Sequence, residues 1–333
     1  MISVVVPMFN EAEVLPEFER RLRAAVVSWG DVVEVVAVDD GSTDHTSALL
    51  RVIAERDARW RVLKLSRNFG HQAAVSAGLE AARGDAVVVI DADLQDPPEV
   101  VERLLDRWRD GFDVVYAVRR NRKEGLLKRA AYAGFYRLWK LTSDVPPAMD
   151  SGDFCVMDRK VVNVINQLPE SNRFLRGLRA WAGFRQVGVE YERESRRAGE
   201  SKYTFRKLVR LASDGLFSFG ATPLRLASAA GVAFCFAAFL LAALVVGWKV
   251  ADVPILGMRP GNAAGWTSIV AVILFSAGVQ MLLLGVIGEY LARIFEEVKG
   301  RPVWVVAEEW GGGYEHSRER NAEGEESGFR SAA

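Results

Sequence analysis

Two long stretches without charge constrain the fold of this chain more than any other feature of its sequence. Residues 226–248 contain no charged side chain, and a second uncharged stretch runs from Pro260 to Gly288, with its apolar part starting at Trp266. A helix needs about 20 apolar residues to cross a bilayer core. Two buried core helices are the alternative, but runs without a polar face would require a far larger soluble domain around them. The pattern predicts a transmembrane hairpin of residues 225–248 and 266–289.

Basic residues near the hairpin predict its orientation. The connecting loop 249–265 contains two basic residues, Lys249 and Arg259. Seven basic residues flank the outer ends of the two spans: Arg206, Lys207, Arg210, Arg225, Arg293, Lys299 and Arg301. Basic residues concentrate on the cytoplasmic side of membrane proteins. The N-terminal apolar run ends at Asn10 and Glu11 without a preceding basic segment, unlike a cleavable signal peptide. We therefore expect both termini, and the first 200 residues, in the cytoplasm.

The first 200 residues alternate between short β-branched runs and helical patterns. Runs such as 35–39 and 87–91 are almost continuously apolar, which is typical of strands covered on both faces. Five such runs predict an α/β domain with a mostly parallel sheet and crossover helices. The 43 basic residues of the chain balance its 43 acidic residues, so it lacks the positive excess of a bulk nucleic-acid-binding protein. Its two cysteines exclude a disulfide-stapled scaffold.

Polar residues follow three of the predicted strands, in segments 7–11 (PMFNE), 39–44 (DDGSTD) and 91–95 (DADLQ). In parallel sheets, ligands bind beyond the carboxyl ends of the strands. Asp91 and Asp93 have the spacing of a pair that can hold a hard divalent cation, and Gln95 offers a third oxygen. Turn formation is the alternative, because Asp, Asn and Gly after a strand also form turns and helix caps. Three such segments at one sheet edge favour a metal and nucleotide site.

Other nucleotide and metal motifs are missing from the sequence. It contains neither a G-x-G-x-x-G after the first strand nor a G-x-x-x-x-G-K-[ST], so neither a dinucleotide fold nor a P-loop is supported. The three histidines, His45, His71 and His316, are too scattered for an imidazole metal site. We expect His71 at a helix start after Gly70 and assign none of the three a catalytic role.

Two basic groups and several flanking segments complete the pattern. The basic groups are Arg119, Arg120, Arg122 and Lys123, and then Arg193, Arg196, Arg197 and Lys202. Each is open to interpretation as a solvated face or as a contact to anionic headgroups. Residues 204–224 mix basic and apolar positions and predict an interfacial helix. Residues 290–310 predict a juxtamembrane helix and a short strand, and the polar tail 311–333 is predicted to be disordered.

The order of the motifs resembles a known family. P-x-[YF]-N-E, D-D-G-S-x-D, D-A-D-L-Q-x-P-P-E, S-G-D-F and R-x-G-x-S-K-Y, followed by two spans, are similar to glycosyltransferase family 2 enzymes acting on polyprenyl phosphates, such as dolichyl-phosphate mannose synthases and bacterial undecaprenyl-phosphate glucosyltransferases. The resemblance covers nearly all of residues 1–306. It implies a Rossmann-like GT-A domain over residues 1–203 that uses a nucleotide-diphosphate sugar and Mg²⁺ or Mn²⁺. It also implies transfer of the sugar to a lipid phosphate with inversion.

The resemblance also implies roles for individual residues. The nucleotide would be bound by Pro7, Phe9, Glu11, Asp39, Asp91 and Ala92, with Glu11 on the ribose hydroxyls. Asp93 and Gln95 would be the metal ligands. Asp153 would lie beside the acceptor, as a base or as an orienting group. Phosphate would be bound by Arg119, with Lys128 or Arg129 as further candidates, and by Arg196 and Arg197. The closing loop 197–203 would contain Arg197 and the catalytic Lys202.

The hypothesis is transfer of a sugar, with UDP-glucose as the leading donor, to undecaprenyl phosphate at the cytoplasmic face of a bacterial inner membrane. GDP-mannose and a UDP-amino-arabinose derivative are alternative donors in the same family. An aspartyl-nucleophile phosphatase using Asp91 and a membrane-tethered nucleotide-sugar sensor are alternatives from other classes. The resemblance further favours a homotetramer.

Overall fold

The computed structural model describes residues 1–119, 151–171, 173–192, 222–251 and 265–312. The chain divides into two compact units. One contains an eight-stranded sheet and its covering helices, and the other contains two long helices, α9 (Thr222–Ala251) and α10 (Trp266–Val298). Each unit is described separately below.

The sheet is built from short, mostly β-branched segments in the order β7-β5-β6-β4-β1-β2-β3-β8. The first five strands occur where the apolar runs predict them: β1 (Ile2–Met8), β2 (Val33–Asp39), β3 (Trp60–Leu65), β4 (Ala86–Val89) and β5 (Val114–Arg119). The remaining strands are β6 (Ser151–Asp158), β7 (Gln186–Tyr191) and β8 (Val306–Gly311). The prediction of an α/β domain is therefore confirmed.

The sheet is mixed, and most of its strands run in one direction, as the sequence predicts. The pairs β1–β2, β1–β4, β2–β3 and β5–β7 are parallel, whereas β4–β6, β5–β6 and β3–β8 are antiparallel. The strand β6 lies between β4 and β5 and runs against both. The parallel part that holds the three polar segments remains as predicted.

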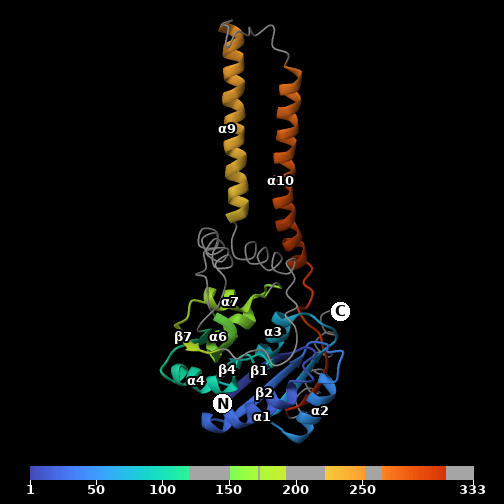
Figure 1. Ribbon diagram of the computed structural model, residues 1–333, viewed down its shortest axis with the longest axis vertical. Coiled ribbons are helices and arrows are strands. Elements are labelled where there is room, and N and C mark those ends of the chain that lie inside the picture. The colour runs from blue at the N-terminus through green and yellow to red at the C-terminus, as the bar shows by residue number, and fades with distance from the viewer. Residues whose placement is uncertain (120–150, 172, 193–221, 252–264, 313–333) are drawn as a thin grey trace, which may run out of the picture. The chain divides into compact units, whose positions relative to one another are not determined.

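Helices cover both faces of the sheet (Figure 1). Apolar side chains of α1 (Leu15–Val26), α2 (Thr46–Arg56) and α4 (Val101–Arg109) join one core with alternate residues of the strands, including Val4 and Val6. On the other face α3 (His71–Ala81) packs on β1 and β2, where a Cβ at Gly78 would lie 2.3 Å from Val5 Cγ1. The helices α6 (Arg159–Gln167) and α7 (Leu175–Trp181) follow β6, and two short 3-10 helices span Val27–Trp29 and Pro98–Val100. The alternation of side chains along each strand thus fills two cores.

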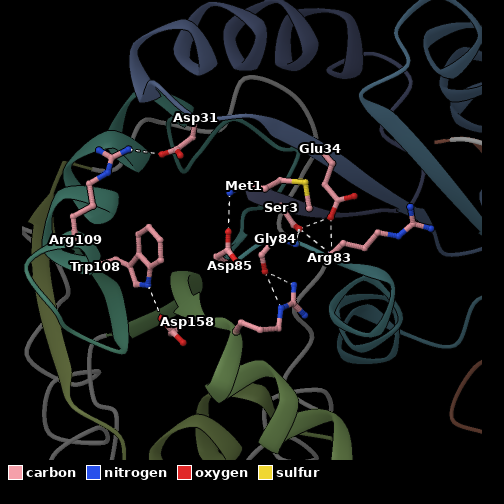
Figure 2. A network of polar contacts seen from close by, with 11 residues as sticks. Met1, Ser3, Asp31, Glu34, Arg83, Gly84, Asp85, Trp108, Arg109 and Asp158 are labelled. Carbon is pink, nitrogen blue, oxygen red and sulfur yellow. Dashed lines mark hydrogen bonds and ion pairs between the residues drawn. The ribbon is translucent and has the colours of Figure 1, made fainter.

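Polar contacts tie the amino ends of the strands together (Figure 2). The Gly84 and Arg83 amides donate to Ser3 Oγ at 2.6 and 3.1 Å, and Ser3 Oγ donates to Glu34. The Met1 ammonium lies 2.8 Å from Asp85 Oδ2. A Cβ at Gly84 would lie 2.5 Å from the Ser3 amide nitrogen, so this close approach requires glycine. This edge is opposite the strand ends that carry the polar motifs, and its contacts are structural.

The last strand, β8, joins the sheet after the long helices. It pairs antiparallel with β3, and two ion pairs accompany the ladder: Arg61 with Glu309 at 2.6 Å and Lys64 with Glu308 at 2.9 Å. This strand overlaps the predicted short strand at residues 306–308 and ends at Gly311, where the sequence predicted the tail to begin.

In the described residues, the second unit contains α9 and α10, which contact each other through Phe234 and Phe275, with ring centroids 5.7 Å apart. In the part of the chain that the structure describes, one segment, Phe275–Val298, is long and apolar enough to cross a membrane, with a mean hydropathy of 1.4 and none of its apolar window buried. Ala227–Leu240 is a shorter apolar helical segment.

Three of the predicted flanking segments are corrected or fall outside the described residues. The helix α10 continues to Val298, so residues 290–298 extend it rather than forming the separate juxtamembrane helix that the sequence predicted. The predicted interfacial helix 204–224 overlaps the described residues only at 222–224, which belong to α9. Residues 313–333 of the predicted tail lie outside the described residues.

Candidate functional site

Three polar segments meet at one edge of the sheet because their strands are parallel neighbours. The strand β1 pairs with β2 on one side and with β4 on the other, so the residues after Met8, Asp39 and Val89 leave the sheet at the same edge. This is the edge at which α/β sheets bind ligands. The structure therefore brings the predicted nucleotide and metal residues together.

The loop after β1 is cross-linked to the loop after β2. Asn10 Oδ1 accepts a hydrogen bond from the Thr43 amide at 2.8 Å, and the Asn10 amide donates to Ser42 Oγ at 3.0 Å. Asn10 has a φ of 58°, a left-handed conformation that asparagine tolerates better than most residues. Phe9 is left 41% exposed in this loop, whereas Pro7 is buried within β1. Phe9 and the partly exposed Glu11 are thus accessible to a nucleotide in this loop.

The aspartates after β2 stabilise loops. Asp39 is fully buried and accepts hydrogen bonds from the Ser42 amide at 3.0 Å and from Ser47 Oγ. Asp40 accepts from the amides of Phe69 and Gly70 at 2.7 and 2.9 Å. Burial raises the pKa of Asp40 above its ordinary value, and these two amides oppose the shift. The turn chemistry that the sequence left open is therefore present, and Asp40 fixes the start of α3.

The segment after β4 carries excess negative charge. Desolvation raises the pKa of Asp91 to about 6; His71 opposes this shift, and the charges of Asp153, Asp96 and Asp93 add to it. Asp93 Oδ1 accepts from the Gln95 amide at 3.1 Å. These carboxylates repel one another, and a bound cation would relieve that repulsion.

The backbone of the same segment is strained. Leu94, between Asp93 and Gln95, has a φ of 60°, a left-handed conformation that leucine rarely adopts. Such strain occurs most often at functional loops. Leu94 and Ala92 are both buried, so their packing holds the loop in this conformation while Asp93 and Gln95 stay partly exposed.

The donor set of this segment fits a divalent cation. Among the described residues, no three His, Cys, Asp or Glu side chains gather as a ready metal site. Mg²⁺ in nucleotide sites is usually held by one or two protein groups together with substrate phosphates and water. Asp93 and Gln95 supply oxygen ligands of that kind.

Asp153 on β6 lies near Asp91. The antiparallel register ends with the pair Val89 and Cys155, each two residues from an aspartate, and the charge of Asp153 acts on Asp91. Asp153 is only 7% exposed; its Oδ1 accepts from Arg176 Nε at 2.9 Å, and its Oδ2 accepts from Gln72 Nε2 at 3.0 Å. Burial opposes ionisation of this carboxyl, but hydrogen bonds and charge from His71 and Arg176 hold its pKa well below its usual range. Asp153 is therefore an ionised group with fixed orientation.

His71 completes this group. It begins α3, as predicted, and its Nε2 lies 3.2 Å from Asp153 Oδ2 and 3.8 Å from Asp91 Oδ1. Desolvation would lower its pKa, but the hydrogen bond to Asp153 and the two carboxylate charges raise the pKa to about 9. The ring is consequently protonated at neutral pH and donates to Asp153.

The sequence analysis missed His71, Gln72 and Arg176 as site residues. A signal for the first two was available, because they begin the helix after β3, the third parallel strand, and therefore lie at the same edge as the three motifs. Arg176 lies in the first turn of α7, which the tertiary fold alone brings near Asp153.

The predicted phosphate-binding residues are described only in part. Arg119 ends β5, and its side chain is outside the described part of the structure. Lys128, Arg129, Arg196, Arg197 and Lys202 lie outside the described residues.

Comparisons with known proteins identify the family. The model of glycosyl transferase family 2 matches residues 3–165. An uncharacterized glycosyltransferase of Bacillus subtilis, YkcC, is 42% identical over 93% of this chain and 94% of its own length. The SfII prophage-derived bactoprenol glucosyl transferase of Shigella flexneri is 40% identical over 92% of this chain and 97% of its own length. The prophage bactoprenol glucosyl transferase homolog of Escherichia coli K12 is 39% identical over 92% of this chain and 98% of its own length. The chain belongs to glycosyl transferase family 2 and is a glycosyltransferase.

Proposed function

We propose that the protein transfers glucose from UDP-glucose to undecaprenyl phosphate, with inversion at the sugar and with Mg²⁺ or Mn²⁺ as cofactor. The observation that carries this proposal is the likeness, at 40% identity over 92% of the chain, to proteins named bactoprenol glucosyl transferase, bactoprenol being another name for undecaprenol. The nearness of Asp91 and Asp153, both within 4 Å of His71 Nε2, supports it, because a transferase needs donor and acceptor groups side by side.

On the donor side, we assign the nucleotide to Pro7, Phe9, Glu11, Asp39, Asp91 and Ala92. Phe9 offers an exposed apolar surface to a base, and Glu11 offers a carboxylate to ribose hydroxyls. Asp39 and Pro7 are buried and support the loops that carry the contacting residues. Asp93 and Gln95 would hold the metal ion, which would neutralise charge on the diphosphate when bound.

On the acceptor side, we assign Asp153 an orienting role rather than that of a general base. An ionised carboxylate with a depressed pKa is a weak proton acceptor at neutral pH. A lipid phosphate is already mostly ionised at pH 7 and needs little deprotonation. Arg119, with Lys128 or Arg129, would bind that phosphate. Arg196, Arg197 and Lys202 would stabilise charge on the departing nucleotide.

We further propose that the catalytic domain, residues 1–203, is anchored by a membrane hairpin. The interfacial helix 204–224, the spans 225–248 and 266–289 and the external loop 249–265 would place both termini and the active site at the cytoplasmic face of the inner membrane. Support comes from the uncharged stretches, the apolar segment Phe275–Val298 and the distribution of basic residues. Residues 290–310 would return to the cytoplasm, followed by the tail 311–333, and the protein would act as a homotetramer.

The test is to incubate the purified protein with Mn²⁺, undecaprenyl phosphate and, separately, UDP-glucose, a UDP-amino-arabinose derivative and GDP-mannose. Lipid products are identified by mass. The proposal predicts a hexosyl undecaprenyl phosphate from UDP-glucose, and none when the metal is chelated. A product from only one of the other donors would overturn the choice of sugar. No lipid product from any donor would overturn the choice of acceptor.

A further inference from the structure

Asp91 and Asp153 would repel each other if nothing lay between them. The β4–β6 pairing ends at Val89 and Cys155, two residues short of each aspartate, and both carboxylates lie within 4 Å of the His71 ring nitrogen Nε2. Like charges that share one site are unfavourable. A transferase that uses one carboxylate on the donor side and the other on the acceptor side nevertheless needs both at a fixed separation.

Among the described residues, His71 contacts both carboxylates. Its Nε2 is 3.2 Å from Asp153 Oδ2 and 3.8 Å from Asp91 Oδ1. A cation at the first residue of a helix is disfavoured by the helix dipole, so helix stability does not explain a protonated histidine there. The ring is also 41% exposed and is not part of the apolar core. What its position does explain is the pairing with two carboxylates.

The other partners of Asp153 hold it from a different side. Arg176 on α7 donates to both carboxylate oxygens, at 2.9 and 3.4 Å. Gln72 donates to Asp153 Oδ2 at 3.0 Å and accepts from the Leu175 amide, at the start of α7, at 2.9 Å. Gln72 and Arg176 therefore tie Asp153 to α7, whereas His71 links it to Asp91.

We propose that His71 is a positioning residue that sets the separation between the donor-side carboxylate of Asp91 and the acceptor-side carboxylate of Asp153. The inference rests on the proposed function, which gives the two carboxylates these roles. Loss of His71 leaves Asp153 bound to Gln72 and Arg176 but lets the two carboxylates move apart.

The test compares His71→Ala, His71→Gln and the control His45→Ala in the full chain. Glutamine can place a neutral N–H donor near the position of His71 Nε2, and alanine cannot. His45 is likewise at a helix start, preceding α2, but its side chain makes no capping hydrogen bond. We measure kcat, KM for UDP-glucose, KM for undecaprenyl phosphate and the thermal unfolding midpoint.

We expect His71→Ala to lower kcat about 100-fold, since displacement of reacting groups by about 1 Å has an effect of this size. Both KM values and the unfolding midpoint at pH 9.5, where the histidine is neutral, should change little. His71→Gln should recover about tenfold of the lost kcat, and His45→Ala should match the wild type. A merely structural role would lower the midpoint at that pH and would show no recovery with glutamine.

Other outcomes separate this inference from the proposed function. If the wild type transfers glucose and His71→Ala keeps kcat within about twofold, the positioning role is wrong and the function stands. A rise in the KM for UDP-glucose alone would make His71 a donor ligand and would also overturn the inference. If the wild type uses another donor, the variants are compared with that donor. If it uses none, both proposals fail.

Discussion

The ion pair between His71 and Asp153 predicts a specific pH dependence of stability. The pKa of His71 is raised from 6.5 to about 9 in the folded protein. A group with a raised pKa stabilises the fold fully below its unfolded value, and this stabilisation is lost as the pH rises through the folded value. The His71 contribution should therefore be complete below pH 6.5 and should disappear between pH 6.5 and about 9.

The magnitude follows from the shift and from the exposure of the ring. A shift of this size would correspond to about 3 kcal/mol for a fully desolvated group. His71 is 41% exposed, so solvent screening reduces the expected contribution to about 1 kcal/mol. For a domain of this size, that free energy corresponds to roughly 2–4 °C in the unfolding midpoint.

The assay is thermal unfolding at pH 6 and pH 9.5, in one detergent and at one scan rate, for the wild type and His71→Gln. Between these pH values, the unfolding midpoint of the wild type should fall by roughly 2–4 °C more than that of the variant. Other groups that titrate in this range contribute to both proteins and cancel in the difference. An equal loss in both proteins would refute the ion pair as described, and His45→Gln should behave as the wild type.

Three further predictions concern the metal, the closing loop and the sheet edge. Asp93→Asn should abolish transfer at saturating Mg²⁺ because one carboxylate ligand is lost, while circular dichroism shows an intact fold. Wild-type turnover with full metal dependence would remove Asp93 from the site. Lys202→Ala should lower kcat more than UDP-glucose affinity, because charge on the departing diphosphate grows in the transition state, and an unchanged kcat would contradict this role. Gly84→Ala should lower the free energy of unfolding by about 1–3 kcal/mol, because the new Cβ would lie 2.5 Å from the Ser3 amide nitrogen. Denaturant unfolding measures this change. The control is Gly247→Ala, where the new Cβ has open space around it.

The parallel strands were predictable because local composition determines them. The strands β1, β2 and β4 are nearly continuous runs of Val, Ile and Ala, which are typical of strands buried on both faces. The strands β6 and β7 were not predicted, since Ser151–Asp158 contains two aspartates and Gln186–Tyr191 alternates polar and apolar residues weakly. The antiparallel insertion of β6 depends on pairing between residues about 70 positions apart, which no local pattern encodes.

The candidate site also contains residues that the sequence predicts and residues that it does not. Asp91 and Asp93 stand out as a motif after a predicted strand, so their presence at the sheet edge was expected, whereas Asp153 was expected beside the acceptor from the resemblance alone. Their neighbour His71 was marked only by its place after the third parallel strand, and Arg176 by no sequence signal, because its contact depends on where α7 begins in three dimensions. Asp40 fixes the start of α3 through the amides of Phe69 and Gly70, a link between side chain and backbone that sequence alone does not reveal.

The late position of β8 in the chain has a consequence during synthesis. About 240 residues separate Leu65, the end of β3, from Val306, the start of β8. At about 5–20 residues per second, the ribosome needs roughly 10–50 s to make that stretch, and during this time β3 lacks its final neighbour. An open strand edge can pair with other nascent chains, and charged side chains on the edge discourage such pairing. Arg61 and Lys64, which later bind Glu309 and Glu308, supply these charges while the sheet is incomplete.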